Sequence, residues 1–377
     1  MHKSLENITV IAVEHAVAAP LCTRHLSEMG AEVIKVERPV TGDFARGYDA
    51  FVHGESSHFS WLNRGKKSVV IDLKTVEGKA NLLELLGRAD VLVSNLAPGA
   101  FERIISDEEM EQFPALVRAH ISGYGNNGPY SNRKAYDLLV QGESGVIAST
   151  GTELEKARPG ISVGDLAGGL YALAAINAAL VQRASTGLGQ RIDISLFDAL
   201  AEWMSPLLLA QKYSGVTPPP AGRGHASITP YGPYTSIDKE EIQIAVQNDG
   251  QWLRLCNEVL DRSDLAENPN FASNSGRLES REKVEAEVSN SFGKLSAVQL
   301  IERLERADVP YGILREVKDV IDHPQLIGRD RWVGAQSQQG HEFEALLPPF
   351  LAERSDLGLK KVPKLGEHSV EILGAKL

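Results

Sequence analysis

Short apolar runs rich in β-branched residues alternate with helical patterns along the first half of the chain. Continuous apolar runs of this length predict buried strands. We expect strands at Ile8–Val13, Ala31–Val36, Ser68–Leu73, Asp90–Val93, Leu116–Ile121 and Gln190–Ser195. Strands that alternate with helices predict a parallel sheet covered by helices on both faces and connected by right-handed crossovers.

The helices between these strands have recognisable start and stop signals. Pro20 opens a helical pattern that Gly30 closes, and a second helix is expected at Val76–Leu86. A long helix is predicted from Leu196 to about Tyr213. The segment Thr41–Lys67 is rich in Gly, Ser, His and Arg and is long for a plain connection, which indicates either a functional loop or a surface excursion.

The segment Ser214–Gly224, SGVTPPPAGRG, has the composition of a linker. After it the pattern predicts a hairpin at Pro233–Gln247, and then helices at Trp252–Leu260, Arg281–Phe292 and Ala297–Ala307. A strand-like tail from Arg329 ends in a short helix, Glu367–Leu373. We therefore predict an α/β protein in which a Rossmann-like open parallel sheet forms a large domain and an α+β domain is smaller. The expected boundaries are 1–213 for the large domain, 214–224 for the linker, 225–325 for the small domain and 326–377 for a segment that returns to the large domain.

Composition narrows the class of protein. Of 377 residues, 42% are hydrophobic and 24% are charged, which is ordinary for a globular chain with a full core. The formal net charge of −11 disfavours a nucleic-acid partner, because phosphate backbones bind to basic surfaces. The chain shows no apolar run of about 20 residues, so no membrane partner is expected. Two isolated cysteines, Cys22 and Cys256, fit a reducing compartment and a cytoplasmic location.

Standard cofactor and metal motifs are missing from the sequence. It contains no GxGxxG after the first strand, so no nicotinamide or flavin cofactor is expected. It also has no phosphate-binding GxxxxGK[ST] loop and no HExxH or CxxC spacing, so no metal site is expected. Five of its histidines lack ligand spacings and are expected to be ordinary surface or core residues: His15, His25, His53, His58 and His225.

Basic and polar residues follow the predicted strands. Arg38 follows the second strand, Lys74 the third and Asn95 the fourth, and Arg103 lies one turn into the next helix. Ligands of open parallel sheets bind at the carboxyl ends of the strands. These residues therefore indicate a phosphate-bearing small molecule, unless each is simply a solvated charge.

The segment ISVGDLAGGL places Asp165 after a glycine and before a long Ala/Leu-rich helical run. An aspartate at this position is typically an N-cap that accepts backbone amides. Alternatively, Gly164, Gly168 and Gly169 leave room for a large ligand to reach the carboxylate, which a helix N-terminus would keep ionised. The segment alone leaves both interpretations open.

Several ordered motifs carry a family resemblance. AAPLCTRHLSEMGAEVIKVERPVTGDFAR, NRGKKSVVIDLKTVEGK, ADVLVSNLAPGAFER, GDLAGGLYALAAINAAL and GLGQRIDISLFDAL occur in this order, and PKLGEHSVEIL closes the chain. The pattern resembles the class III coenzyme A transferases, which include formyl-CoA and carnitine CoA-transferases and have α-methylacyl-CoA racemase as a relative. The likeness runs nearly end to end.

The resemblance implies site residues position by position. Asp165 matches the family's nucleophilic aspartate. The other matched positions, implied to bind CoA or its acyl group, are His15, Ala16, Val17, Arg38, Leu73, Asn95, Leu96, Arg103, Lys134, Tyr136 and Asp137. Within this set, backbone amides of the His15–Val17 stretch are implied to hold acyl and oxyanion groups. Formyl-CoA transferase has glutamine where Val17 stands, which argues against a formyl or oxalate substrate.

The same resemblance implies coenzyme A or acyl-CoA as substrate, a small carboxylic acid as partner and an interlocked homodimer. Transfer would pass through an aspartyl anhydride and an aspartyl-CoA thioester. Arg46, Arg64 and Arg223 are candidates to bind a second carboxylate, which leads us to expect succinyl-CoA and a dicarboxylate. The alternatives are a racemase or isomerase of the same fold, and a CoA-binding protein without catalysis. Tyr136 stands where the racemases have histidine, and a phenol is a poor general base at neutral pH.

Overall fold

The computed structural model describes residues 4–351 and 360–374 and divides the chain into two compact units. The first unit comprises the chain through Val146, Pro159–Ser205 and the part from Pro324 onward. The second comprises Ile147–Arg158 and Pro206–His323, so it includes the segment 214–224. Each unit has its own hydrophobic core.

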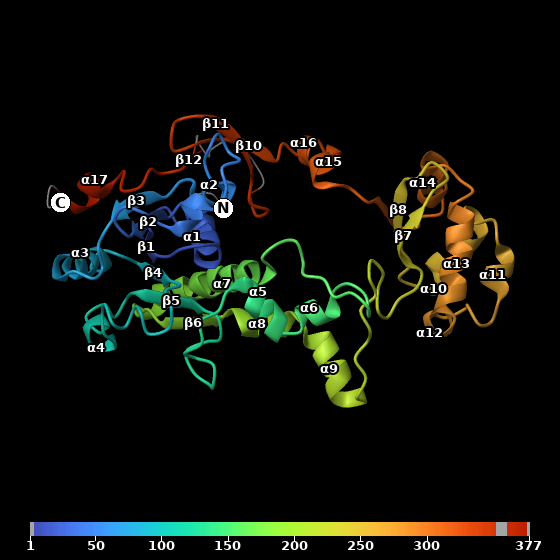
Figure 1. The fold of residues 1–377 in the computed structure, drawn as a ribbon, viewed down its shortest axis with the longest axis horizontal. Helices are drawn as coiled ribbons and strands as arrows, with labels where there is room; N and C mark the ends of the chain where they lie inside the picture. The colour runs from blue at the N-terminus through green and yellow to red at the C-terminus, as the bar shows by residue number, and fades with distance from the viewer. Residues whose placement is uncertain (1–3, 352–359, 375–377) are drawn as a thin grey trace. The chain divides into compact units, whose positions relative to one another are not determined.

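A six-stranded parallel sheet forms the centre of the first unit (Figure 1). Its strands are β1 (Thr9–Val13), β2 (Glu32–Glu37), β3 (Lys67–Val70), β4 (Val91–Ser94), β5 (Val117–Ser122) and β6 (Arg191–Ser195). Their order across the sheet is β3-β2-β1-β4-β5-β6. This is the doubly wound order, in which the chain reverses its direction of travel between β1 and β4. The predicted α/β class and parallel sheet are confirmed.

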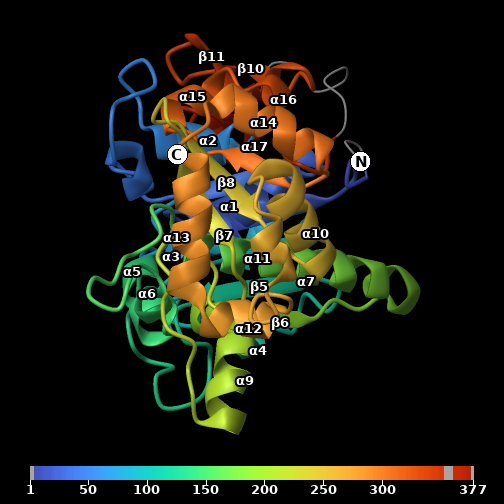
Figure 2. The same cartoon turned by 90° about the vertical axis from the view of Figure 1, so that its right-hand side faces the viewer.

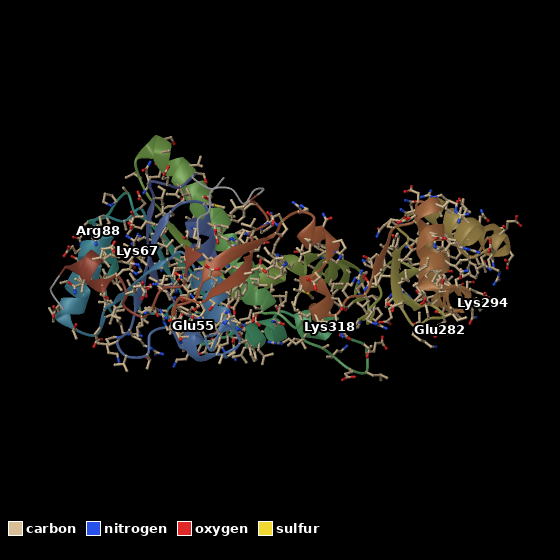
Figure 3. All side chains as sticks on the ribbon, turned by 90° about the horizontal axis from the view of Figure 1, so that it is seen from above. Glu55, Lys67, Arg88, Glu282, Lys294 and Lys318 are labelled. Carbon is tan, nitrogen blue, oxygen red and sulfur yellow. The ribbon has the colours of Figure 1, made fainter. Side chains whose placement is uncertain are left out.

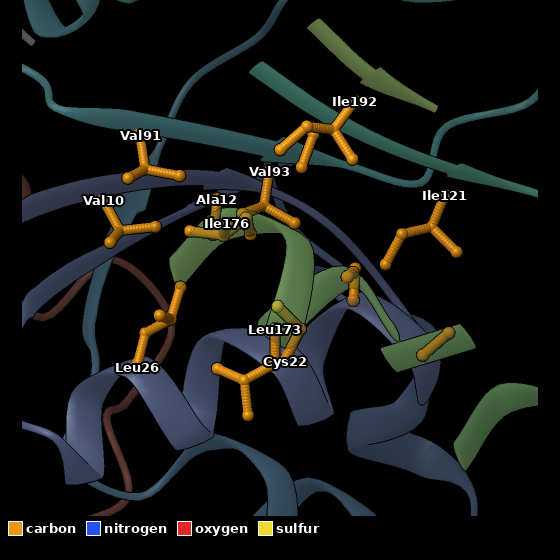
Figure 4. Packing of buried hydrophobic residues seen from close by; sticks show 14 of the residues in the cluster. Val10, Ala12, Cys22, Leu26, Val91, Val93, Ile121, Leu173, Ile176 and Ile192 are labelled. Atoms are coloured by element: carbon orange, nitrogen blue, oxygen red, sulfur yellow. The ribbon is translucent and has the colours of Figure 1, made fainter. Parts of the chain in front are cut away.

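The strands β1, β2 and β4 are buried on both faces over most of their length, as the apolar runs of β1 and β4 predicted, whereas β5 and β6 include half-buried residues. Val10 and Ala12 point to one face and pack with Cys22, Leu26 and Ile176 (Figure 4). Their neighbours in β1, Ile11 and Val13, point to the other face and pack with residues of the next helices. The alternation of side chains along a strand therefore assigns each residue to one of two core layers.

The helices of the first unit cover both faces and connect the strands. They are α1 (Ala18–Glu28), η1 (Phe44–Gly47), α2 (Ser57–Asn63), α3 (Val76–Leu86), α4 (Asp107–Met110), α5 (Asp137–Glu143), α6 (Val146–Ser149, at the boundary of the two units), α7 (Val163–Thr186), α8 (Leu196–Trp203), α16 (Pro324–Ile327) and α17 (Ser369–Leu373). A second sheet of this unit has the order β11-β10-β12, with β10 (Trp332–Gln336), β11 (Glu342–Leu346) and β12 (Lys360–Lys361).

The long helix α7 passes the length and composition test for a membrane span. The sequence expectation that no segment approaches such a span is corrected for this helix. The expectation overlooked it because Asp165, Asn177 and Arg183 interrupt the apolar run. In the structure α7 packs against α1, α5, α8, β5 and β6 in the manner of a core helix.

The second unit contains a three-stranded antiparallel sheet with helices packed around it (Figures 1 and 2). Its strands are β7 (Tyr231–Thr235), β8 (Glu241–Ala245) and β9 (Tyr311–Ile313). Its helices are α9 (Ser205–Ser214, which starts at the boundary), α10 (Asp249–Arg254), the π-helical turn η2 (Leu255–Val259), α11 (Ser263–Glu267), α12 (Asn274–Glu279), α13 (Arg281–Phe292), α14 (Ala297–Arg306) and α15 (Val317–Ile321). The predicted hairpin and the helix at 281–292 are present.

Three predicted elements are corrected. The helix expected from Leu196 to Tyr213 is two helices, because the chain breaks at Met204 and restarts before Pro206, which cannot donate a backbone hydrogen bond. The third strand ends at Val70, since its pairing partner β2 ends at Glu37. The segment Thr41–Lys67 is not an irregular surface loop. It contains η1 and α2, which pack in a small hydrophobic cluster around Phe59.

Candidate active site

A cavity of about 380 Å³ opens at the carboxyl edge of the sheet. Its walls come from the ends of β1, β2 and β3 and from the segments that follow β1, β2, β3 and β4, so residues on both sides of the reversal point line it. The lining residues are Val13, Glu14, His15, Val36, Glu37, Arg38, Gly42, Asp43, Phe44, Ile71, Asp72, Leu73, Lys74, Leu96, Ala97 and Ala100. This is the position at which open parallel sheets bind their ligands.

Several residues named from the sequence line this cavity. Arg38, Leu73, Lys74 and Leu96 are brought together from three different connections. Arg38 donates from Nε to the carbonyl oxygen of Gly42 at 2.8 Å, which fixes the position of its guanidinium group. Two cations at the rim of an otherwise apolar and acidic cavity suit a phosphate-bearing ligand.

Asn95 and Arg103 lie beside the cavity and are not part of its wall. The side chain of Asn95 clamps the backbone of His15: its Oδ1 accepts the His15 N–H at 3.0 Å and its Nδ2 donates to the His15 carbonyl at 2.8 Å. Arg103 extends toward Gly99, whose added Cβ would lie 3.1 Å from a guanidinium nitrogen. Asn95 therefore affects the cavity indirectly, because it fixes the backbone of the segment that follows β1.

The backbone amides after β1 already have partners. The N–H of His15 donates to Asn95, and the N–H of Ala16 donates to Asp43 Oδ1 at 3.1 Å. These two amides are therefore engaged, and the role implied for the His15–Val17 stretch stays a prediction that now depends on the amide of Val17. Ala16 has φ = 64°, a left-handed conformation that is costly for alanine, and the hydrogen bond to Asp43 helps to hold it there.

Asp43 belongs to a buried ionic network beneath the cavity. Its Oδ2 accepts from Lys35 at 2.9 Å, and Lys35 also pairs with Glu14 at 3.3 Å. Lys66 pairs with Glu14 at 2.7 Å, and all four side chains are fully buried. Burial opposes the ionised form of Glu14, but Lys66 and Lys35 lower its pKa below the usual range. For Lys66, burial is the larger effect and lowers its pKa to about 8.

Asp165 lies in the first turn of α7, which begins at Val163 after the N-cap Ser162. The N-cap interpretation from the sequence is therefore wrong. The amides at this helix start are instead accepted by Asp137, whose Oδ1 binds the N–H of Gly164 at 2.8 Å and that of Asp165 at 3.4 Å. Asp137 is itself buried and accepts from Gln141 Nε2 at 2.6 Å.

The electrostatics of Asp165 differ from the sequence expectation. Burial and, after it, the nearby carboxylate of Asp137 raise the pKa of Asp165 to about 7. A helix N-terminus alone would have kept the group fully ionised at neutral pH. The physical reason for the difference is that Asp137 already occupies the amides of the helix start and adds a second negative charge.

The glycines around Asp165 have a packing role. A Cβ on Gly169 would lie 2.5 Å from the carbonyl oxygen of Ala18, and one on Gly168 would lie 2.3 Å from Leu196 Cδ2. A Cβ on Gly164 would meet Asp137 Oδ1 at 3.0 Å. These glycines allow α7 to approach α1, α8 and Asp137 closely. The expected role, room for a ligand beside the carboxylate, finds no support at these contacts.

Tyr48 connects Asp165 to the cavity, and sequence reasoning missed it. Burial raises the pKa of Tyr48 to about 12, and the charges of Asp43 and Asp165 add to the effect. The Tyr48 ring lies 5.8 Å from that of Phe44, and Phe44 lies 4.8 Å from the ring of His15, where both residues line the cavity. A row of rings thus leads from the cavity to the vicinity of Asp165. Phe44 and Tyr48 lie in the connection Thr41–Lys67. The unusual length of this connection was the signal in the sequence that pointed to them.

Lys134 and Tyr136 are exposed at the start of α5. Tyr136 immediately precedes Asp137 and, with Asp165, contributes to the raised pKa of Tyr48, so it lies in the same region. Lys134 is exposed, lies two residues before Tyr136 in the chain and does not line the cavity.

The three arginines considered for a second carboxylate are otherwise engaged. Arg46 pairs with Glu37 at 2.6 Å and stacks over Phe59. Arg64 is buried and pairs with Glu28 at 3.1 Å. Arg223 belongs to the second unit and pairs with Glu241 at 2.7 Å. In the described residues none of them presents a free guanidinium group to the cavity, so this expectation is corrected.

Within residues 4–351 and 360–374, no group of three or more His, Cys, Asp and Glu side chains is arranged to hold a metal ion.

Comparisons with known proteins agree with this architecture. The chain matches the model of CoA-transferase family III over residues 5–369. It is 33% identical to succinate–glutarate CoA-transferase of Agrobacterium fabrum, over 98% of this chain and 94% of the relative. It is 30% identical to formyl-CoA:oxalate CoA-transferase of Streptomyces avermitilis, over 100% of this chain and 96% of the relative. A CaiB/BaiF family protein from Brucella suis has the same fold, with a TM-score of 0.83, 31% identity and 99% of each chain covered. The chain belongs to CoA-transferase family III.

Proposed function

We propose that this enzyme moves CoA from succinyl-CoA or a similar donor to a four- or five-carbon dicarboxylate, with Asp165 as the nucleophile. One observation carries the proposal. Asp165 is a carboxylate with a pKa near 7 whose charge acts on the Tyr48 phenol, and Tyr48 is joined by ring contacts to the cavity at the carboxyl edge of the sheet. The relatives named for succinate–glutarate and formyl-CoA:oxalate transfer support dicarboxylates as a class.

The proposed reaction needs no ATP, because one thioester is exchanged for another. The Asp165 carboxylate attacks the donor thioester carbonyl, the C–S bond breaks, and a mixed anhydride forms with release of the CoA thiolate. The thiolate then attacks the aspartyl carbonyl, which breaks the anhydride C–O bond, releases the donor acid as its carboxylate and leaves CoA in thioester linkage to Asp165.

The acceptor carboxylate reverses these steps. It attacks the aspartyl thioester carbonyl and expels the thiolate, which gives a second mixed anhydride. The thiolate attacks the acyl carbonyl of the acceptor, and the Asp165 carboxylate leaves as it entered. Arg38 and Lys74 would hold the phosphates of CoA, and the apolar side chains of Leu73 and Leu96 would flank the adenosine end.

Each addition creates an oxyanion that requires donors. Because the amides of His15 and Ala16 are engaged, we assign this role to the amide of Val17 and to a side-chain donor. The hydroxyl of Tyr48 is a suitable candidate: its raised pKa keeps it protonated at neutral pH, so it can donate.

The test is covalent trapping. We expect incubation with succinyl-CoA, followed by hydroxylamine or by mass spectrometry of the peptide that contains residue 165, to show an adduct at Asp165. Asp165→Ala should lack the adduct and the transfer activity and should retain the fold. A variant that still transfers CoA, with contaminating parent enzyme excluded, would refute the assignment.

The same experiment separates the alternatives. A CoA-binding protein without catalysis would bind acyl-CoA and form no adduct. A racemase or isomerase would introduce solvent deuterium at the α-carbon of an acyl-CoA without an added acceptor. Tyr136, at the position of the racemase histidine, is 67% exposed and disfavours that chemistry.

We further propose an interlocked homodimer in the cytoplasm. Helix α9 buries none of its residues, and Leu208, Leu209 and Tyr213 are exposed on it, which suits a face covered by a second copy. Two free, buried cysteines are compatible with a reducing compartment. Sedimentation should show a dimer at all accessible concentrations, and a stable monomer would contradict the dimer.

A further inference from the structure

The ring of Tyr48 contacts a histidine that the proposed chemistry has not used. The ring of His58 meets that of Tyr48 edge-on, with centroids 5.6 Å apart and an interplanar angle of 83°. Its Nδ1 lies 3.3 Å from Asp49 Oδ2. Sequence reasoning treated His58 as an ordinary histidine because it lies in no ligand spacing.

Asp49 is built to fix this imidazole. It accepts the N–H of Ser57 at 2.7 Å, the hydroxyl of Ser57 at 2.9 Å and the N–H of Phe51 at 3.1 Å. Burial opposes ionisation, but these hydrogen bonds and that from His58 together outweigh it and hold the pKa of Asp49 well below its usual range. An ionised acceptor at Nδ1 requires a proton there and leaves Nε2 as the second polar atom of the ring.

The accessible side chain of this pair is His58. The His58 side chain is 48% exposed, whereas that of Asp49 is 11% exposed. Ring contacts join His15 to Phe44, Phe44 to Tyr48 and Tyr48 to His58, and the charge of Asp165 acts on Tyr48. An acyl group attached to CoA in the cavity and reacting at Asp165 would extend past Tyr48 toward His58.

We infer that His58, oriented by Asp49, binds the distal carboxylate of a dicarboxylic acyl group and so sets the substrate class. This inference rests on the proposed function. The carboxylate accepts from Nε2–H while Asp49 accepts from Nδ1–H, so each ring nitrogen donates to one carboxylate. His58 thereby takes the role that Arg46, Arg64 and Arg223 do not fill, since those arginines pair with Glu37, Glu28 and Glu241.

The experiment compares two donors of equal chain length, succinyl-CoA and butyryl-CoA. The second lacks the distal carboxylate. The readout is the second-order rate constant of adduct formation at Asp165 in single turnovers. It is expressed as the ratio of the value for succinyl-CoA to the value for butyryl-CoA. Loss of one charge-assisted hydrogen bond should lower this ratio about ten- to a hundredfold in His58→Leu. His58→Arg, which keeps a cationic donor, should recover a large part of it.

A matched control is available in the same connection. His53 is also exposed, contacts His341 rather than Tyr48, and bonds to the carbonyl of Glu342. His53→Leu should leave the ratio unchanged. Asp49→Asn should lower the ratio by a smaller factor than His58→Leu, because the imidazole keeps its position beside Tyr48 but loses its ionised partner.

The outcomes distinguish this inference from the proposed function. An unchanged ratio in His58→Leu, or an equal slowing with both donors, would overturn the role of His58, while adduct formation would still uphold Asp165 as nucleophile. Absence of any adduct in the parent enzyme, with transfer still observed, would instead overturn the covalent mechanism. If His58→Leu fails to fold by circular dichroism, the Asp49→Asn and His58→Arg ratios decide.

Discussion

The side chain of Asp137 accepts the backbone N–H of Asp165 at 3.4 Å, so the nucleophile candidate and its acidic neighbour share one helix start. Burial and the Asp137 charge raise the pKa of Asp165 to about 7. Only the ionised carboxylate attacks a thioester, so acylation should increase with pH through about 7 and level off about one unit higher. Quenched single turnovers with succinyl-CoA, read by mass at Asp165, measure this profile.

Asp137→Asn provides the control for that profile. The substitution removes the charge and keeps an oxygen for the Gly164 amide. Gln141 can rotate its amide to serve the new Nδ2, since Gln141 Oε1 has no hydrogen-bond partner among the described residues. The midpoint of acylation should move to lower pH. An unmoved midpoint would show that Asp137 does not govern the ionisation of Asp165.

A second prediction concerns stability and follows from the same pKa. The folded-state pKa of Asp165, about 7, lies above its ordinary value of 3.8, so the native state binds the proton more tightly. Its contribution is favourable below pH 4 and is lost as pH rises through 7. Asp165→Asn should therefore be more stable than the parent at pH 8 by about 1–3 kcal/mol, a value discounted for partial exposure of the site.

Urea unfolding at pH 8 and at pH 4.5 measures this difference. The advantage of Asp165→Asn should shrink at the lower pH, where the parent carboxyl group is protonated in the native state. If Asp165→Asn is less stable than the parent at pH 8, the ionised carboxylate of Asp165 does not destabilise the folded protein. Activity and stability are thus expected to oppose one another at this position, as they often do in active sites.

The cations at the cavity rim give a third prediction. Arg38→Ala should raise the KM for acyl-CoA about tenfold and change kcat little, because a phosphate contact far from the reacting carbonyl is equally strong in ground and transition states. Arg88 is a suitable control: it is exposed, bonds to the Ile372 carbonyl and precedes β4, at the opposite edge of the sheet (Figure 3). Equal effects of Arg38→Ala and Arg88→Ala would argue against phosphate binding in the cavity.

The strands β1 and β4 were predictable because each is an apolar run buried on both faces. The strands β5 and β6 alternate apolar and polar residues, which also predicts a strand. Val10 and Ile11 are adjacent in β1 but belong to the cores on opposite faces of the sheet, so burial favours an apolar side chain at both positions. The positions of Arg38, Leu73 and Leu96 at one cavity follow from this topology, since parallel strands bring their carboxyl ends to one edge. The break at Met204 was also within reach, because Pro206 is visible in the sequence.

The partners of the polar groups could not be predicted from the sequence. The backbone N–H of Ala16 donates to the side chain of Asp43, 27 positions away, and no local sequence pattern predicts that hydrogen bond. The raised pKa of Asp165 depends on Asp137, and the engagement of Arg64 depends on Glu28, which are tertiary relationships. Tyr48 and His58 lie in a connection without hydrophobic periodicity, so no pattern predicted that the two rings meet or that the charge of Asp165 acts on Tyr48.

Close helix packing gives a fourth prediction. Gly169→Ala would place a Cβ 2.5 Å from the Ala18 carbonyl oxygen, a backbone atom that cannot move aside without shifting α1. We expect a loss of about 1–3 kcal/mol in the free energy of unfolding. Gly142→Ala in α5, where no atom lies within 4 Å of the new Cβ, should be neutral or stabilise by up to about 1 kcal/mol. Similar losses in both variants would contradict the packing argument.

Adjacent lysines provide the last prediction, because they differ in burial and in partners. Lys66 is fully buried, pairs with Glu14 at 2.7 Å and also donates to the Pro20 carbonyl. Lys67 is 33% exposed and pairs with Glu32 and Glu371 at the surface (Figure 3). Lys66→Met leaves Glu14 with one cation instead of two and should cost about 3 kcal/mol of unfolding free energy. Lys67→Met should cost less than about 1 kcal/mol.

Chemical denaturation at two salt concentrations tests this pair of variants. The surface pairs of Lys67 should weaken in high salt, whereas the buried pair of Lys66 is shielded from the solvent ions. Because Lys35 joins Glu14 to Asp43, and Asp43 holds the Ala16 amide, the loss of Lys66 should also raise the KM for acyl-CoA in protein that remains folded. If Lys66→Met and Lys67→Met lowered the free energy of unfolding equally, the buried network would not stabilise the segment after β1. Other contacts would then have to determine the shape of the cavity.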